Sequence, residues 1–223
     1  MIRVEYIKTW GFEHAIRGMR NPMNSWEKSD SIVVSEGCEF CESYYLDCND
    51  CFNDGGTCMH LGLNDLELMK KLANAGSSHR KFLRQIFISM DITAPLYWWK
   101  EFDTYKIGTT ANSCSTMHTI HKKEFTLEDF STEYLGDDVI KNPFLTVIDC
   151  LNFFRELYLQ HKDKSDWYTM IQILPSSYNQ KRTVTMNYEN ALNVITQREN
   201  HRLEEWQDFI KVLRGLPFME QIT

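Results

Sequence analysis

No run in this sequence approaches the roughly 20 consecutive apolar residues that cross a bilayer. The first residues, Met1 to Glu5, lack the apolar core of a signal peptide. The chain has no internal repeat and no low-complexity tract, and it has no lysine or arginine between Ser29 and Met69. These absences argue against a membrane protein, a repeat protein and a disordered chain, and we expect a cytoplasmic protein.

The composition is that of an ordinary globular protein. The 223 residues are 43% hydrophobic and 25% charged, so we expect a single domain over residues 1–223. The formal charge of −7 is local, because nine acidic residues lie between Ser29 and Met69 and the other 22 nearly balance the 24 basic ones. We therefore expect no nucleic-acid partner bound over a broad basic surface, whereas a local pocket for a phosphate group stays open.

Five of the seven cysteines lie close together in the chain. Cys38, Cys41, Cys48 and Cys51 form the pattern Cys-x2-Cys-x6-Cys-x2-Cys, and Cys58 follows. Two Cys-x2-Cys pairs supply the four thiolates of a tetrahedral zinc site, and the same ligands also hold iron–sulfur clusters. The six residues between the pairs are fewer than in most zinc ribbons, so disulfides and unliganded thiols stay open as alternatives. We expect residues 36–60 to form a metal-binding insertion with a structural role.

Hydrophobic periodicity predicts an α+β chain in which helices dominate. The clearest strand is Ile86–Ala94, where apolar and polar residues alternate, and Pro95 then suits the first turn of an aromatic helix. A second strand is expected at Ile2–Lys8 and a short one at Ser31–Ser35. The other expected helices are Phe12–Arg20, Leu66–Ala75 with a cap at Asn64-Asp65, a long helix marked by Phe144 to Tyr158, Trp167–Leu174, and a last long helix from the Asn187 cap to Leu213.

A polar segment from Asp103 to His118 follows the aromatic helix. It holds one glycine, several hydroxyls and no run of aliphatic residues. Backbone N–H groups and short hydroxyl donors are the usual means of binding an anion, although hydroxyl-rich loops are also common on surfaces. A Cys–His nucleophile built from Cys114 is not expected, because close sequence neighbours seldom form such a pair. His118 and His121, without a third ligand, are more typical of a surface than of a metal site.

The order of these elements resembles that of the flavin-dependent thymidylate synthases. The family signature, Arg-His-Arg-x-x-Ser-x-Asn-Glu-x-Ser-x-Arg-Tyr, also follows an Ala-Pro that ends a strand, as Ala94-Pro95 does here. The matching positions in this chain are Thr104-Tyr105-Lys106, Thr109, Asn112, Ser113, Ser115 and Met117-His118, with one inserted residue. The second half of the chain is similar to the family at Leu174-Pro175, Tyr178, Asn187 and Arg198-x-Asn200-x-Arg202-x-Glu204.

The resemblance implies a fold, a reaction and a set of site residues. It implies a helix-rich α+β fold with a small antiparallel sheet, and a homotetramer with FAD at the subunit junctions. NADPH would reduce the flavin, and a methylene group from methylenetetrahydrofolate would be transferred to C5 of dUMP, with hydride from the flavin. The implied cofactor-binding residues are His79, Gln85, Thr104, Tyr105, Lys106, Thr109 and Asn187. The implied substrate-binding residues are Asn112, Ser113, Cys114, Ser115 and Arg198, of which Ser115 and Arg198 are the candidate catalytic residues.

Departures from the signature leave alternatives open. Most signature arginines are absent, and losing each phosphate-binding arginine costs about 1.5–3 kcal/mol. Two such losses weaken the affinity for dUMP by a factor of roughly 100 to 10,000 unless Lys106, Lys181 or Arg182 takes their place. One alternative is therefore a divergent enzyme that acts on another nucleotide. The other is a non-catalytic interaction protein that presents the cysteine segment to a partner.

Overall fold

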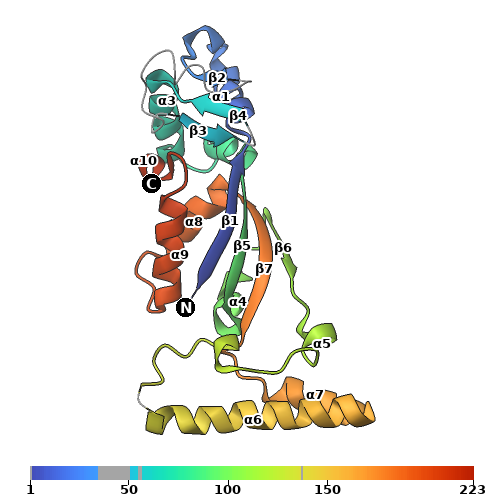
Figure 1. The fold of residues 1–223 in the computed structure, drawn as a ribbon. Coiled ribbons are helices and arrows are strands. Elements are labelled where there is room, and N and C mark those ends of the chain that lie inside the picture. Colours follow the sequence, from blue (N-terminus) through green and yellow to red (C-terminus); the bar gives the residue numbers. More distant parts are fainter. Residues whose placement is uncertain (1, 35–50, 55–56, 137) are drawn as a thin grey trace. The chain divides into compact units, whose positions relative to one another are not determined.

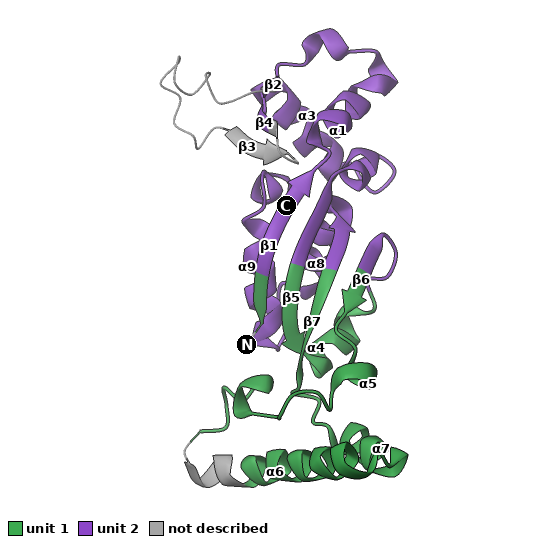
Figure 2. Cartoon of the chain, turned by 45° about the vertical axis from the view of Figure 1, so that its right-hand side comes forward, with its two compact units in different colours: residues 1–4, 91–104, 111–183 green, residues 5–90, 105–110, 184–223 purple. Residues whose placement is uncertain are grey.

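The structure is a computed structural model that describes residues 2–34, 51–54, 57–136 and 138–223. Figure 2 colours two compact units, each assembled from separate stretches of the chain. Unit 1 comprises residues 1–4, 91–104 and 111–183, and unit 2 comprises residues 5–90, 105–110 and 184–223. Because neither unit is one continuous stretch, the expectation of a single domain over residues 1–223 stays a prediction.

The helices and strands follow the expected α+β pattern (Figure 1). The strands are β1 (Arg3–Trp10), β2 (Ile32–Val34), β3 (Cys51–Asp54), β4 (Thr57–His60), β5 (Phe87–Pro95), β6 (Thr109–Ser113) and β7 (Asn179–Asn187). The α-helices are α1 (Phe12–Arg20), α3 (Leu63–Asn74), α4 (Leu96–Phe102), α5 (Thr116–Thr119), α6 (Asp138–His161), α7 (Lys164–Ile173), α8 (Tyr188–Arg198), α9 (Glu204–Arg214) and α10 (Met219–Ile222). Short 3-10 helices lie at Asn21–Met23 (η1), Trp26–Lys28 (η2), Arg80–Gln85 (η3) and Leu127–Asp129 (η4).

Two small sheets hold the strands together. The larger has the order β1-β5-β7-β6, and the smaller has the order β2-β4-β3 with both pairs antiparallel. Strands β5 and β7 are also antiparallel, because Thr183 contacts Asp91 while Thr185 contacts Ser89. Every second residue of β5 from Ile88 to Ala94 is buried, which confirms the strand predicted from the alternation.

Strand β7 was not predicted from the sequence. Its residues include Asn179, Gln180, Lys181 and Arg182, which give no apolar alternation. Only its second half buries the apolar side chains of Val184 and Met186. Contacts with β5 and β6 decide its conformation, which is the usual outcome where a strand has weak local propensity.

Unit 1 has two groups of buried side chains. In α4, Trp98, Trp99 and Phe102 are at most 2% exposed and pack ring against ring, which confirms that the two tryptophans belong to the core. The second group lies where α6 and α7 pack, and it extends to the segment before α6. Its buried members are Ile120, Phe125, Phe130, Ile148, Leu151 and Met170.

Unit 2 packs α1, α3, η3 and the three last helices around another core. The Phe12 ring meets the Tyr188 ring edge-on at 5.2 Å, and the Tyr188 backbone N–H donates to the Ile86 carbonyl at 2.9 Å. The prediction of one long helix from Asn187 to Leu213 is wrong, because α8 ends at Arg198 and α9 begins at Glu204. The side-chain amide of Gln207 donates to the carbonyls of Arg198 and His201, so polar groups freed by the break have a partner.

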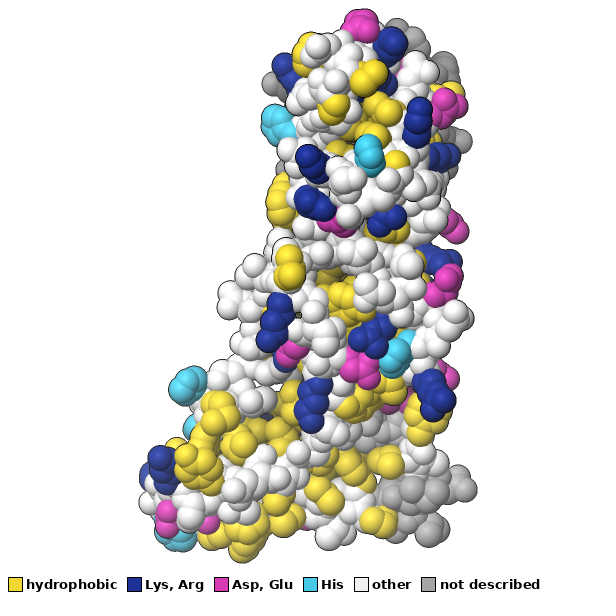
Figure 3. Space-filling view, turned by 180° about the vertical axis from the view of Figure 1, so that it is seen from behind, with side chains coloured by type: hydrophobic (Ala, Val, Ile, Leu, Met, Phe, Trp, Pro, Cys, Tyr) yellow, Lys and Arg dark blue, Asp and Glu magenta, His cyan; other side chains and the backbone are white. Residues whose placement is uncertain are grey.

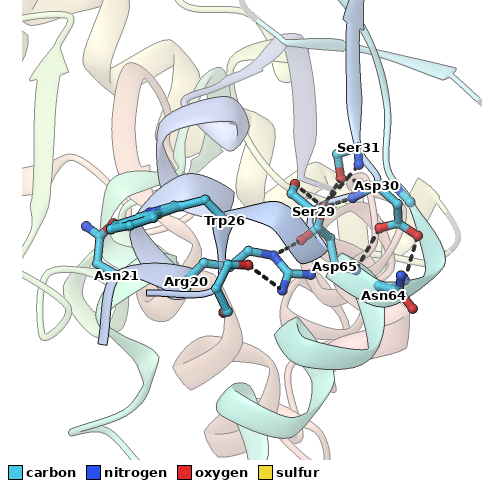
Figure 4. Close-up of polar contacts among 10 residues, drawn as sticks. Arg20, Asn21, Trp26, Ser29, Asp30, Ser31, Asn64 and Asp65 are labelled. Carbon is cyan, nitrogen blue, oxygen red and sulfur yellow. Dashed lines mark hydrogen bonds and ion pairs between the residues drawn. The ribbon is translucent and has the colours of Figure 1, made fainter. Parts of the chain in front are cut away.

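The predicted cap of α3 is also wrong. This helix begins at Leu63 after Gly62, so Asp65 lies in its first turn. The Asp65 carboxylate is fully buried and accepts hydrogen bonds from the side chains of Arg20, Ser29 and Ser31 and from the backbone N–H groups of Asp30 and Ser31 (Figure 4). It therefore connects the end of α1 and the segment before β2 to α3.

Among the residues that the structure describes, no helix is both long and apolar enough to cross a membrane.

Candidate functional site

The segment Tyr105–Thr110 lies along α8 in unit 2. Near the start of the helix, the Asn190 side-chain amide donates to the Ile107 carbonyl at 2.6 Å and to the Thr109 hydroxyl at 3.0 Å. Near its end, Nε of Arg198 donates to the Tyr105 hydroxyl at 3.0 Å. Asn190 and Arg198 are eight positions apart in α8, which corresponds to about 12 Å along the helix axis. The helix therefore holds this segment at both ends.

Arg198 is held against two aromatic rings. The centre of its guanidinium lies 4.7 Å from the Trp206 ring centroid and 5.7 Å from that of Tyr105. The two rings are themselves 6.0 Å apart and meet edge-on. A cation in this position is attracted to the ring faces, and its side chain loses little further freedom when it binds a ligand. The structure thus brings together two predicted site residues, Arg198 at the end of α8 and Tyr105 at the start of the segment Tyr105–Thr110.

Asn187 and Gly108 fix the other end of the segment. The Asn187 carboxamide oxygen accepts from the Asn190 backbone N–H at 2.9 Å, which is the N-cap predicted for this residue. Gly108 has a φ of +74°, and a Cβ built on it would lie 2.8 Å from the Asn187 side-chain nitrogen. Any larger residue at Gly108 would push the segment away from the start of α8.

Four of the five predicted substrate-binding residues lie in unit 1, and the fifth, Arg198, lies in unit 2. Asn112 and Ser113 end β6 with exposed side chains. The Cys114 backbone N–H donates to the Lys181 carbonyl at 2.9 Å, and the Cys114 carbonyl accepts from the Gln180 side chain at 2.8 Å. The Ser115 hydroxyl accepts from the His118 backbone N–H at 3.1 Å and so caps α5. Contacts to β7 therefore position this segment, and its exposed groups are those of Asn112, Ser113 and Cys114.

Two of the three basic residues suggested as replacements for the missing arginines, Lys181 and Arg182, already have acidic partners in unit 1. Arg182 pairs with Asp103 at 2.7 Å, and its guanidinium centre lies 4.1 Å from the Trp99 ring centroid. Lys181 pairs with Asp91 at 2.9 Å. A phosphate would therefore have to compete with a carboxylate for either cation.

The remaining predicted cofactor-binding residues have varied surroundings. The Thr104 hydroxyl donates to the Glu101 carbonyl at 2.8 Å, and Lys106 is exposed beside Ile107, whose side chain is 92% exposed. His79 is exposed immediately before η3. Gln85 lies against α1, since its side-chain oxygen would be 2.9 Å from a Cβ built on Gly18. Thr104 lies in unit 1, whereas Arg198 lies in unit 2.

The cysteine cluster falls largely outside the described residues. Cys38, Cys41 and Cys48 are not described, and Cys51 is described only by its place at the start of β3, where its backbone pairs with that of His60. Within the described residues, no group of three or more His, Cys, Asp or Glu side chains is arranged to hold a metal ion. The metal site at these four cysteines stays a prediction.

Two features of this site were missed by the sequence reasoning. Trp206 falls within the last predicted helix but was given no role, although its ring faces Arg198. Arg84 was also given no role, but it forms a two-pronged ion pair with Glu189 in the first turn of α8. Sequence spacing gives no signal for either contact, because the partners come from different elements.

Comparison with solved structures assigns the fold. No protein-family model matches the chain, and no curated protein matches it. The fold is that of the flavin-dependent thymidylate synthases, as the signature resemblance predicts. Thymidylate synthase X (ThyX) from Helicobacter pylori with FAD and dUMP superposes with a TM-score of 0.63 at 17% identity, over 99% of this chain and 94% of that one. A second structure of the flavin-dependent enzyme from Helicobacter pylori, also complexed with FAD and dUMP, gives a TM-score of 0.62 at 16% identity, covering 99% and 95%.

Proposed function

We propose that this protein is a flavin-dependent enzyme that transfers a one-carbon unit to C5 of a pyrimidine nucleotide, as in the conversion of dUMP to dTMP. The observation that carries the proposal is a fold shared over nearly the full length of both chains with proteins whose structures hold FAD and dUMP. The arrangement around Arg198 supports it, because a positioned guanidinium beside aromatic rings suits a nucleotide.

The residues of unit 2 suit a flavin nucleotide. The segment Tyr105–Thr110 presents the exposed cation of Lys106 and the exposed apolar side chain of Ile107 close to the start of α8. A helix N-terminus favours phosphate groups, and an apolar side chain without cover favours a ring system. We assign Tyr105, Lys106, Thr109 and Asn187 to this role. FAD, when bound, would supply the hydride of the reaction.

The finer details of the reaction are also proposals. We propose methylenetetrahydrofolate as the methylene donor and NADPH as the reductant of the flavin, on the family resemblance. In unit 1, the exposed side chains of Asn112, Ser113 and Cys114 would bind the nucleotide, and Ser115 would position them through its cap of α5. Arg198 would bind the nucleotide by its guanidinium, held in orientation by Tyr105 and Trp206.

We further propose that the protein is a cytoplasmic homotetramer. Exposed apolar side chains on α6 favour self-association, and Figure 3 shows hydrophobic side chains gathered over this helix. Leu145, Phe153 and Leu159 are 40%, 57% and 37% exposed. At 3.6 residues per turn they lie within roughly 120° of one another around the helix, next to its buried face. A second copy of the chain would remove them from water.

The experiment that tests the enzymatic proposal measures flavin and substrate binding separately. Purified protein should absorb between 350 and 500 nm or take up FAD in a titration, and it should release tritium from dUMP labelled at C5 when the donor and the reductant are added. Arg198→Lys should weaken nucleotide binding by about tenfold or more while the melting temperature stays unchanged, because lysine keeps the charge but loses the planar fork. The matched control is Arg214→Lys, because Arg214 at the end of α9 forms an exposed ion pair with Glu199. A colourless protein that binds no FAD would refute the proposal.

A different nucleotide substrate is the second candidate function. It is favoured by the ion pairs of Arg182 with Asp103 and of Lys181 with Asp91, which leave these cations engaged by carboxylates. A thermal-shift panel of pyrimidine and purine nucleotides decides between the two. A shift with dUMP alone supports the first candidate, and a larger shift with another nucleotide supports the second.

The metal proposal concerns the cysteine segment alone. We propose that Cys38, Cys41, Cys48 and Cys51 bind zinc, with an iron–sulfur cluster as the alternative, and that the segment serves as a structural or interaction element. Elemental analysis should find about one zinc per chain. Cys38→Ser should reduce the zinc content, whereas Cys114→Ser should not, because Cys114 is an exposed residue that directly follows β6. A metal-free protein in which all thiols react would refute it.

A further inference from the structure

A cavity of about 430 Å³ lies in unit 1, lined by residues of three elements. His118 comes from α5, and His121 follows that helix. Tyr158 comes from the end of α6, Lys162 directly follows that helix, and Lys164 and Trp167 come from the first turn of α7. Its volume is in the range of small-molecule sites in proteins. None of these residues was assigned to the proposed reaction.

The described residues that line the cavity include Lys162 and Lys164 and no acidic side chain. Burial lowers the pKa of His121, and the charges of Lys162, Lys122 and Arg155 lower it further, so the groups that act on this imidazole are cations. Asp163 lies between the two lysines in sequence, but its carboxylate caps α7 by accepting from the Ser165 backbone N–H. Positive potential inside a cavity attracts anions.

Two buried nitrogen atoms in this region have hydrogen-bonding capacity to spare. Nδ1 of His121 and Nε of Arg155 are buried and have no hydrogen-bond partner among the described residues. A buried polar nitrogen without a partner costs free energy, which a ligand or an ordered water at the site recovers. His121 itself lines the cavity, so a ligand bound there lies beside its imidazole ring.

Aromatic rings complete the lining. The His121 imidazole meets the Tyr158 ring edge-on at 4.9 Å, and Nζ of Lys162 lies 5.4 Å from the centre of the same ring. Trp167 adds the indole of α7. In the region of α7 and the adjoining end of α6, Figure 3 shows hydrophobic side chains with Lys or Arg, His, and Asp or Glu side chains around them. A cation-rich rim beside aromatic walls suits a ligand that carries both an anionic group and a planar ring.

We propose that this cavity binds a phosphorylated compound with a planar ring, of the mononucleotide class, through residues distinct from the group around Arg198. The phosphate contacts Lys162 and Lys164, and the ring packs on Tyr158 and Trp167. This site does not depend on the proposed reaction, because it uses no residue of the flavin or substrate set.

The test is calorimetric titration of the full chain with AMP, which is not a pyrimidine nucleotide, compared with adenosine and with inorganic phosphate. We expect AMP to bind at least about tenfold more tightly than either fragment, because each fragment makes only part of the contacts. The double substitution Lys162→Gln with Lys164→Gln should weaken nucleotide binding about tenfold or more. Both side chains are exposed, so the fold should be kept. Lys100→Gln, exposed at the end of α4, is the charge-matched control.

The location of binding is checked independently. The imidazole resonances of His121 should shift when the nucleotide is added, and Arg198→Lys should leave this binding unchanged. Absence of nucleotide binding, binding that survives the double substitution, or binding that is lost in Arg198→Lys instead would overturn the proposal. Equal affinity for inorganic phosphate and nucleotide would also overturn it, because the ring would then contribute nothing. Each of these outcomes can be measured even if the protein binds no flavin.

Discussion

The buried carboxylate of Asp65 offers the sharpest test of how unit 2 is held together. Asp65→Asn changes one oxygen into an NH2 group and removes the charge that faces Arg20, which is itself only 4% exposed. One carboxylate oxygen accepts from Nε of Arg20 at 2.6 Å, and the other accepts four hydrogen bonds from Ser29, Asp30 and Ser31. Whichever way the amide is turned, its NH2 faces donors.

The expected loss of stability is large for a single substitution. Removing one partner of a buried ion pair typically costs about 3–5 kcal/mol, because the other charge stays buried without compensation. For a chain of this length, that corresponds to a fall in melting temperature of about 6–20 °C. Urea unfolding at pH 7 should show a lower midpoint with an unchanged slope. Glu67→Gln, an exposed residue two positions further along α3, is the control and should change stability by less than about 0.5 kcal/mol.

The pH dependence gives a second reading of the same contact. Burial raises the pKa of Asp65, but hydrogen bonds from Ser31, Ser29 and Arg20 and the charge of Arg20 outweigh it, so the pKa lies below the ordinary 3.8. A group with a lowered pKa stabilises the fold above its unfolded-state pKa and loses this contribution as the pH falls through its folded-state pKa. The difference between wild type and Asp65→Asn should therefore be full at neutral pH and shrink below about pH 4. A difference under about 1 kcal/mol at pH 7, or one that does not shrink in acid, would refute the reasoning.

Three further substitutions test local features by chemical unfolding. Gly11→Ala should cost about 2 kcal/mol or more, because Gly11 has a φ of +98° and the new Cβ would lie 2.3 Å from the Gln85 carbonyl oxygen. Gly76→Ala has nearly the same φ and no atom within 4 Å, so an equal loss there would show that the close approach is irrelevant. Asn187→Ala should cost about 1–2 kcal/mol by removing the cap of α8, and no change would contradict the assigned cap. Leu151→Ala should cost about 2–5 kcal/mol, because this fully buried side chain leaves a cavity between α6 and its neighbours.

Where the sequence reasoning succeeded, the signal was periodic and short in range. The alternation in β5 and the amphipathic pattern of α1 each repeat within one element, because residues on the same face recur at fixed spacing. The boundaries of α1 match the prediction, and those of β5 differ by one residue at each end. The fold was predicted from the order of elements and of motif residues, which needs no knowledge of contacts.

Where it failed, the decision lay in contacts between distant residues. The Gln207 side chain donates hydrogen bonds to carbonyl groups where α8 ends. The apolar stripe that predicts one long helix therefore belongs to two helices, α8 and α9. Asp65 is a residue type that often caps a helix, which is why a cap was predicted there. Its carboxylate instead accepts a hydrogen bond from Arg20, which lies 45 residues away in the chain. The polar first half of β7 becomes a strand only because β5 and β6 lie beside it.

The sequence by itself determined the helix-rich α+β class, the amphipathic and alternating elements, the position of the polar segment after α4 and the clustering of the cysteines. Only the tertiary structure decided that Arg198 lies between Tyr105 and Trp206, that Arg182 and Lys181 are paired with acids, and that the two histidines after Ser115 share a cavity with two lysines. The reason is physical: periodicity reports which side of an element is buried, whereas charge pairing and cavity lining depend on which distant elements pack together.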